Sequence, residues 1–304
     1  MLRRDYQVRV LARATSRTSA LEARGVEIAR GDILDSALIE KALDGCDVLF
    51  HAAAIYELWA PDPDLMIRTE IAGTVNALNA ALRCGTPKVV YTSTAVAIGE
   101  RKGEVGNEET LHRGYFLSVY EKAKYDAEVA AKEFLQKGMD LRIIKPAGVM
   151  GAGDLKPTGK GVVDMLNGKF PMLFDGTLTG VDVRDVALVH ALAAEKGERG
   201  RDYIAAGWIV STREWLGTAC RIAGKRLPLF GPAVFAKVFA AGCEVYARAT
   251  KSEPLLSLET HKLLTHGFRV DGSRAARELG VKYRSLEECM TSAVGWYRAQ
   301  GLIR

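Results

Sequence analysis

Short apolar runs alternate with longer helical patterns through the first two thirds of the chain. Short runs rich in β-branched and aromatic residues are typical of strands, whereas apolar residues three and four positions apart are typical of amphipathic helices. The expected strands are residues 7–12, 26–29, 47–51 (a buried strand), 88–93 and 141–145. The expected helices are residues 18–24, 38–43, 65–83 and 120–137. Strands that alternate with helices predict a parallel sheet covered by helices on both faces.

The pattern changes at Gly148. From there to Pro171 glycine and proline are frequent, which predicts a loop. The alternation of strand and helix returns at residues 181–194 and 202–206, and beyond Gly207 the apolar spacing is mostly helical. The helices expected there are residues 215–222, 234–246, 273–279 and 286–299.

The 304 residues are enough for one large α/β unit with an appended lobe. We predict a doubly wound α/β domain made of residues 1–152 with 178–207, and a smaller, mostly helical lobe made of residues 153–177 with 208–304. In an open parallel sheet the ligand binds beyond the carboxyl ends of the strands. The active site is therefore expected in the cleft between the sheet and the lobe.

Composition narrows the class of protein. The net charge is +5, and no window holds the dense block of Lys and Arg that a general nucleic-acid binder needs, so we expect no nucleic-acid partner. A basic pocket for an anionic cofactor or substrate is not excluded. The five cysteines are widely spaced and form no metal-binding pattern, which favours a reducing compartment. Because the first residues lack the apolar segment of a secretory signal, a cytoplasmic protein is expected.

No uninterrupted apolar run approaches the roughly 18 residues needed to cross a membrane, so we expect no membrane span. The longest apolar stretch, residues 227–249, is broken by Pro232, Lys237, Glu244 and Arg248. One interpretation of this stretch is an amphipathic helix lining a domain, and the other is contact with a membrane surface.

Three side chains near strand ends carry candidate chemistry. Thr94 directly follows the strand 88–93, and Tyr120 and Lys124 lie four residues apart, on one face of the next helix. An ammonium at Lys124 is expected to lower the pKa of the Tyr120 phenol from its usual value near 10, which would make it an acid/base at neutral pH. The spacing alone also fits a packed tyrosine beside a solvated lysine. The strand-end hydroxyl before this pair, and the strand ending in Lys145 and Pro146 after it, favour the site.

In this order the motifs resemble the extended short-chain dehydrogenase/reductases, the NAD-dependent epimerase/dehydratase family. Within that family the chain is most similar to hopanoid-associated sugar epimerases and dihydroflavonol reductase-like proteins. The matching segments are HAA from His51, YELWAPDPDLM from Tyr56, GT from Gly73 with Asn76, YTSTAVAIG from Tyr91, YEKAKYDAE from Tyr120, KPAGVMGAGDLKPTGKG from Lys145, VDVRDVALVH from Val181 and SRAARELG from Ser273. The resemblance implies a Rossmann-like NAD(P)-binding domain with a substrate-binding lobe.

The resemblance also assigns roles to residues. Tyr120 would be the general acid/base, Lys124 would tune that phenol and bind the nicotinamide ribose, and Thr94 would hydrogen-bond the reacting oxygen. Four further positions would contact the dinucleotide: Asp32 and Ile33 near the adenine, and Ala52 and Ala53 along its length. Pro146 would lie near the nicotinamide, and Glu70 stands where relatives usually carry Asn and receives no role.

Arg13, at the end of the strand 7–12, occupies the position that reads the adenosine ribose. An acidic residue there accepts a hydrogen bond from the 2′-hydroxyl of NAD, whereas arginine suits the 2′-phosphate of NADP. With Arg17 nearby, NADP is the expected cofactor and NAD the alternative. The other interpretation is that Arg13 is a solvated strand end.

The beginning of the chain departs from the family. The family opens with a strand, a Gly-x-x-Gly-x-x-Gly turn and a helix that holds the pyrophosphate, and the residues for that unit, roughly 20, are not found here. The glycines at 148–153 follow the wrong strand and suggest a hinge loop, and residues 153–161 do not fit a phosphate-binding loop. The histidines show no metal spacing, so structural roles and no metal are expected, with His51 a neighbour of the cofactor.

The sequence therefore predicts an NAD(P)-dependent oxidoreductase or sugar-nucleotide epimerase that acts on a small molecule by hydride transfer. Its alternative is a non-catalytic Rossmann-like binding or scaffold protein without a phosphate-binding loop. By analogy with the family we expect a homodimer formed through helices 73–83 and 120–137. Phe170, Met172, Tyr246 and the loop 154–156 are candidate substrate contacts, although core or surface roles also suit them.

Overall fold

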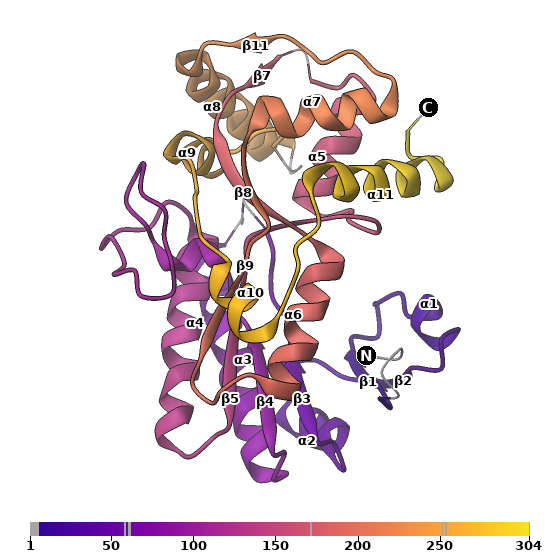
Figure 1. Cartoon of the computed structure of the whole chain (residues 1–304), viewed down its shortest axis with the longest axis vertical. Coiled ribbons are helices and arrows are strands. Elements are labelled where there is room, and N and C mark those ends of the chain that lie inside the picture. The colour runs from indigo at the N-terminus through magenta and orange to yellow at the C-terminus, as the bar shows by residue number, and fades with distance from the viewer. Residues whose placement is uncertain are drawn as a thin grey trace.

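The computed structural model describes residues 6–57, 59, 62–170, 172–250, 252 and 254–303. Figure 1 shows a lower part, in which helices lie against a sheet, beneath an upper part made mostly of helices. The strands are β1 (Arg9–Ala12), β2 (Glu27–Arg30), β3 (Val48–His51), β4 (Lys88–Thr92), β5 (Leu141–Pro146), β6 (Gly148–Met150), β7 (Leu173–Phe174), β8 (Thr177–Asp182), β9 (Asp202–Ala205), β10 (Trp208–Ser211) and β11 (Phe230–Gly231). The helices are α1 (Ser19–Glu22), α2 (Ser36–Leu43), α3 (Pro63–Arg83), α4 (Val119–Gln136), α5 (Pro157–Leu166), α6 (Val183–Lys196), α7 (Thr212–Ala223), α8 (Ala233–Thr250), α9 (Leu258–His266), α10 (Ser273–Leu279) and α11 (Leu286–Ala299).

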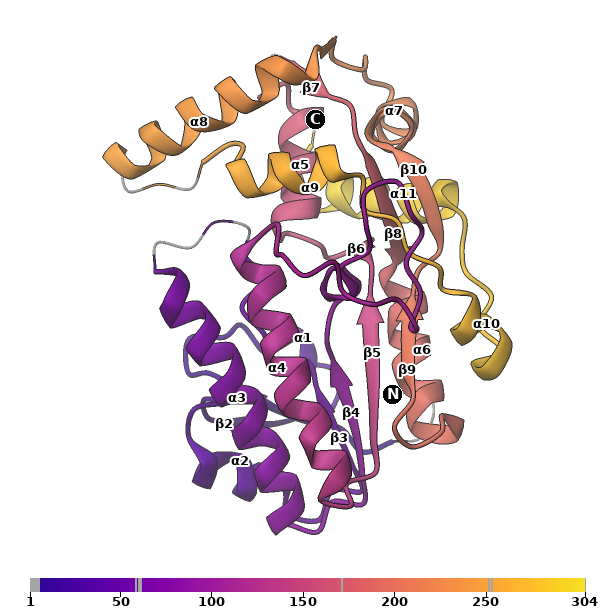
Figure 2. The same ribbon diagram turned by 90° about the vertical axis from the view of Figure 1, so that its left-hand side faces the viewer.

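The main sheet has four parallel strands in the order β3-β4-β5-β9. Side chains alternate between its faces: Val89 and Tyr91 pack in a cluster with α3 and α4, whereas Val90 packs with α6 and α10. Figure 2 shows α3 and α4 side by side on one face of the sheet. The predicted parallel sheet with helices on both faces is confirmed. The helix α10 belongs to the predicted lobe by its residue numbers, but it packs on β9 and α6 of the sheet. The exact domain boundaries stay a prediction.

The strand β3 differs from the prediction of a buried strand. Val48, Leu49 and Phe50 are only partly buried, and His51 alone is fully buried. The reason is that β3 is an edge of the main sheet, and within the described ranges no strand pairs with its outer side.

The strands β1 and β2 form a separate two-stranded parallel sheet. Figure 1 shows this pair beside the main sheet rather than within it. The Arg9 guanidinium donates to the carbonyl oxygens of Ala42 and Asp44, at 3.0 and 2.8 Å, and the Asn76 amide donates to the carbonyl oxygen of Ile33 at 3.1 Å. These contacts attach the small sheet to the end of α2 and to α3.

The upper part contains a core shared by α5, α7 and α11, beside the three-stranded sheet β10-β8-β6. The prediction of a loop over residues 148–171 is wrong, because β6 and α5 lie within it. Pro157 occupies the first turn of α5, where its missing N–H costs nothing. Gly159 is required by a close approach rather than by a turn, since a Cβ there would lie 2.2 Å from the carbonyl oxygen of Asp154. Within the part of the chain that the structure describes, no helix is both long and apolar enough to cross a membrane.

Candidate active site

Two local structures place Thr94, Tyr120 and Lys124 at the carboxyl end of the main sheet. Thr94 caps the short 3₁₀ helix Ala95–Ile98 that follows β4, with its hydroxyl accepting from the Val96 N–H at 3.4 Å. Ser118 caps α4, accepting from the Glu121 N–H at 3.0 Å, so the helix begins just before Tyr120. Tyr120, Lys124 and Thr94 are all buried.

The Lys124 ammonium has two hydrogen-bond acceptors and one aromatic neighbour. It donates to the Glu70 carboxylate of α3 at 2.9 Å and to the carbonyl oxygen of Thr92 at 2.8 Å, and it lies 5.2 Å from the centre of the Tyr91 ring. Both side chains of the Glu70–Lys124 pair are 2% exposed. The second oxygen of Glu70 accepts from the Ile55 N–H at 3.1 Å. The sequence assigned no role to Glu70, and the only signal that could have identified it was an acid at the family's Asn position.

The Tyr120 phenol meets aromatic and hydroxyl groups from three elements. The Thr94 side chain lies near enough to lower the pKa of the phenol, and the Tyr120 ring meets the Tyr56 ring edge-on, with centroids 5.2 Å apart. The Tyr56 hydroxyl in turn lies 3.1 Å from the Thr158 hydroxyl of α5, which connects the sheet domain to the upper lobe.

The pKa of Tyr120 lies above its usual value, mainly because of burial and then because of Tyr56 and Glu70, while the Thr94 side chain lowers it. The prediction that Lys124 lowers this pKa is therefore wrong for the structure. The physical reason is that Lys124 pairs with Glu70, so that a carboxylate accompanies the positive charge near the phenol.

The other predicted cofactor residues also lie at strand ends. Arg13 is exposed just after β1, and Ala52 and Ala53 are exposed just after β3. Asp32 follows β2 and accepts from the Leu34 N–H at 3.0 Å, while the neighbouring Ile33 packs against Gly73 of α3. Pro146 is buried as the last residue of β5. The structure thus brings Thr94, Tyr120 and Lys124 together and distributes the rest along one edge of the two sheets.

Two histidines near the carboxyl end of the sheet, the buried His51 and the partly buried His190, have hydrogen-bond partners. His51 Nε2 lies 3.3 Å from the Thr74 hydroxyl, and its ring stacks on Tyr91. Burial first, and then the charge of Lys124, lowers the pKa of His51 to about 3. His190 lies between the Thr92 hydroxyl and the carbonyl oxygen of Val186. Among the described residues no cluster of three or more His, Cys, Asp or Glu side chains could hold a metal ion.

Comparisons with known proteins agree with this geometry. Residues 1–206 match the model of the NAD dependent epimerase/dehydratase family. The chain is 32% identical to a protein named "Putative dihydroflavonol 4-reductase" from Synechocystis sp., covering 100% of this chain and 91% of the relative. It is 29% identical to sterol demethylase protein B from Methylococcus capsulatus, covering 100% and 94%. It also resembles the crystal structure of gox2253 with a TM-score of 0.86 and 32% identity, over 100% of this chain and 94% of that one. The chain therefore belongs to the NAD-dependent epimerase/dehydratase family and is an enzyme of the extended short-chain dehydrogenase/reductase type.

Proposed function

We propose that this enzyme moves a hydride between a nicotinamide cofactor and a carbinol or carbonyl carbon of a small molecule, with Tyr120 as the acid/base. The observation that carries the proposal is the buried Tyr120, which lies one helical turn from the buried Lys124 and near the buried Thr94, whose side chain lowers the pKa of the phenol. A phenol, a second hydroxyl and an ammonium at the carboxyl end of a parallel sheet are the groups that proton transfer to a bound oxygen requires.

The strand ends suit a dinucleotide. Ala52 and Ala53 are small, apolar and exposed directly after β3, so a nucleotide can pack against them. In this arrangement Lys124 holds the nicotinamide ribose, Pro146 borders the nicotinamide, and Asp32 with Ile33 borders the adenine. The fit rests on the small size and exposure of the two alanines.

NADP is the proposed form of the cofactor, with NAD as the alternative. Arg13 and Arg17 are exposed in the loop after β1. The Arg30 guanidinium donates to the carbonyl oxygen of Arg13 at 3.1 Å, and it also pairs with Glu22 at 3.5 Å. The guanidinium groups of Arg13 and Arg17 therefore carry the preference for a 2′-phosphate over a 2′-hydroxyl.

The raised pKa of Tyr120 has a defined chemical use. A phenol whose pKa is raised stays protonated at neutral pH, so Tyr120 holds the proton that a carbonyl oxygen takes up on reduction. Thr94 lies beside this hydroxyl, whose pKa it lowers, and would hold the reacting oxygen there. We therefore propose carbonyl reduction first. A sugar-nucleotide epimerase is the second candidate, favoured by the family that matches residues 1–206.

Tyr120→Phe tests this proposal, with Tyr125→Phe as the matched control on the same helix. Tyr125 packs against His112 and Phe116, away from Thr94, so its hydroxyl has no part in the proposed chemistry. We expect Tyr120→Phe to lose at least a thousandfold in kcat, with NADPH affinity changed less than threefold, since only the proton donor is removed. Tyr125→Phe should keep its activity.

The assay uses NADPH with a panel of carbonyl compounds and nucleotide sugars, and nicotinamide fluorescence measures cofactor binding. If Tyr120→Phe keeps most of the wild-type rate, Tyr120 is not the acid/base. Turnover of a nucleotide sugar in the presence of oxidised NADP, without net reduction of the cofactor, selects the epimerase.

We further propose a homodimer that pairs α3 and α4 of two copies, and a cytoplasmic location. Helices α3 and α4 already lie side by side on one face of the sheet, which gives a ready surface for a two-fold interface (Figure 2). All five cysteines are free thiols, as expected in a reducing compartment.

A further inference from the structure

The helix α8 is packed with its small side chains inward and its large apolar side chains outward. Ala236, Ala240 and Ala247 are at most 2% exposed. On the opposite side Phe235, Val238, Val245 and Tyr246 are 59, 70, 70 and 68% exposed, and they form what we call the apolar ridge. An ordinary amphipathic helix of a folded domain shows the reverse arrangement. Packing within the described chain therefore leaves most of the surface of the ridge uncovered.

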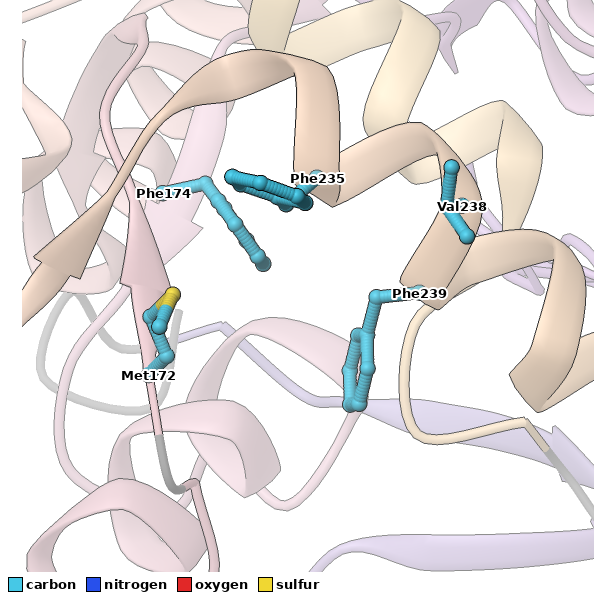
Figure 3. Close-up of a pocket in the computed structure, with 5 residues that line it drawn as sticks. All are labelled: Met172, Phe174, Phe235, Val238 and Phe239. Carbon is cyan, nitrogen blue, oxygen red and sulfur yellow. The ribbon is translucent and has the colours of Figure 1, made fainter.

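A shallow hollow lies beside the ridge. It has a volume of about 400 Å³ and is lined by Met172, Phe174, Phe235, Val238 and Phe239. Figure 3 shows these side chains around the space between β7 and α8, with the three aromatic rings set at different angles. Apolar side chains thus extend from the ridge into a concave surface that can receive a hydrocarbon group.

Charged residues around the ridge are almost all basic. From residue 225 to residue 250 the chain carries four basic residues, Lys225, Arg226, Lys237 and Arg248, and all of them are exposed. The one acid is Glu244, whose side chain is only 13% exposed. It accepts from the Leu258 N–H of α9 at 2.7 Å and pairs with Arg248 at 3.8 Å, while the Arg248 side chain stays 75% exposed. Since successive residues turn by about 100° around a helix, Lys237 and Arg248 lie on the same border of the ridge.

We propose that α8 docks on the surface of an anionic lipid bilayer, with the apolar ridge inserted among the acyl chains and the basic border on the lipid headgroups. An apolar face beside a basic face is the arrangement of helices that lie in the plane of a membrane surface. The basic border matches anionic headgroups. It opposes a second copy of the same chain, because two like-charged borders would meet at such an interface. The proposal does not rest on the chemistry of Tyr120.

Docking would bring the bilayer close to the active site through two contacts. Leu258 of α9 is held by Glu244 of α8, and Glu259 of α9 accepts from the Val119 N–H at 3.0 Å, next to Tyr120. The docked helix is thus separated from the catalytic helix α4 by α9 alone.

The test is co-sedimentation of the full chain with vesicles of neutral phosphatidylcholine and with vesicles that contain 30% phosphatidylglycerol. We expect at least tenfold stronger partitioning onto the anionic vesicles, weakened by added salt. The double variant Val238→Asp/Val245→Asp should lose at least tenfold of this binding, and Lys237→Glu/Arg248→Glu should lose the preference for anionic lipid. All four positions are exposed, so these variants are expected to fold, which circular dichroism checks.

Leu111→Asp is the matched control, since Leu111 is 89% exposed and lies in a different surface loop. It should bind vesicles as the wild type does. A folded wild type that does not bind anionic vesicles overturns the proposal, and so does an equal loss in Leu111→Asp and the ridge variant. Sedimentation velocity without lipid gives one more outcome: a dimer that the ridge variant converts to monomer would make the ridge an interface between copies, and the proposal would be wrong.

Discussion

The pair of Glu70 and Lys124 makes a quantitative prediction about stability. Both side chains are 2% exposed, so Glu70→Gln leaves the buried Lys124 ammonium with neutral partners alone: the new amide oxygen, the Thr92 carbonyl oxygen and the Tyr91 ring. Removing one partner of a buried ion pair costs about 3–5 kcal/mol of unfolding free energy. At about 2 °C per kcal/mol for a chain of this size, Tm should fall by roughly 6–10 °C.

The double variant Glu70→Gln/Lys124→Met separates this electrostatic effect from a packing effect. It removes both charges at similar volume, and replacing a buried pair by neutral groups is often close to neutral in stability. We expect the double variant to recover most of the lost stability, with a coupling free energy of at least about 2 kcal/mol. It should remain inactive, because Lys124 is then missing from the site.

The charge of Glu70 also acts on Tyr120. It is the smallest contribution to the raised pKa of Tyr120, after burial and Tyr56, so Glu70→Gln should lower that pKa only slightly. The groups around the pair are His51, Tyr91 and Tyr120, and the first two are held far from titration near neutral pH.

Asp126→Asn is the matched control, because Lys122 and Asp126 form a partly exposed pair on the same helix. Its cost should stay below about 1 kcal/mol. Thermal and urea unfolding measure these effects. Additive single-variant effects in the double variant, or a Glu70→Gln protein with unchanged stability, would refute the electrostatic account of this pair.

Three further outcomes are expected. Sedimentation at micromolar protein should show a dimer, and a charged substitution at Val129, which is 48% exposed on α4, should give monomer; a wild-type monomer removes the proposed interface. Arg13→Ala should weaken NADPH by roughly tenfold and NADH little in a fluorescence titration, whereas Arg24→Ala should change neither, and equal losses of both cofactors would contradict the 2′-phosphate assignment. The pKa of His51 is lowered to about 3 in the folded chain, so the unfolded chain takes up this proton first as pH falls through about 6.5. Between pH 7.5 and pH 5 the wild type should therefore lose about 2 kcal/mol more unfolding free energy than His51→Gln, as measured by urea melts. Equal losses would exclude His51 as the cause.

The parallel sheet and the alternation of strands and helices could be predicted because the spacing of apolar residues and the side-chain types favour the same conformation there. The strand 88–93 and the helix 65–83 need no tertiary information, since their apolar spacing already selects one conformation. The prediction of a loop over residues 148–171 was wrong because residue type and conformation do not agree there. Gly159 looks like a loop residue in the sequence, but it serves the close passage of two backbones inside a helical lobe.

The candidate site was predictable as residue types but not as electrostatics. Tyr120 and Lys124 share a helix face because of their spacing, which the sequence states directly. Lys124 and Glu70 are 54 residues apart in the chain. Their pairing depends on how α3 packs against α4, which the spacing of residues does not state. For α8 the helix itself was predicted, but period alone cannot tell whether the alanine side or the valine and phenylalanine side is buried.

The separation of β1 and β2 from the main sheet has a consequence for how the molecule opens. No ladder of backbone hydrogen bonds joins β1 to β3 within the described ranges, so the small sheet depends on a few side-chain contacts to α2 and α3. Such a segment can detach as a subglobal unit with a free energy well below that of global unfolding. Native-state hydrogen exchange should therefore show two classes of amides, with those of β1 and β2 exchanging together and much earlier than those of β4 and β5. Because Arg13, Arg17 and Arg30 lie on this unit, a bound nucleotide would slow its exchange selectively.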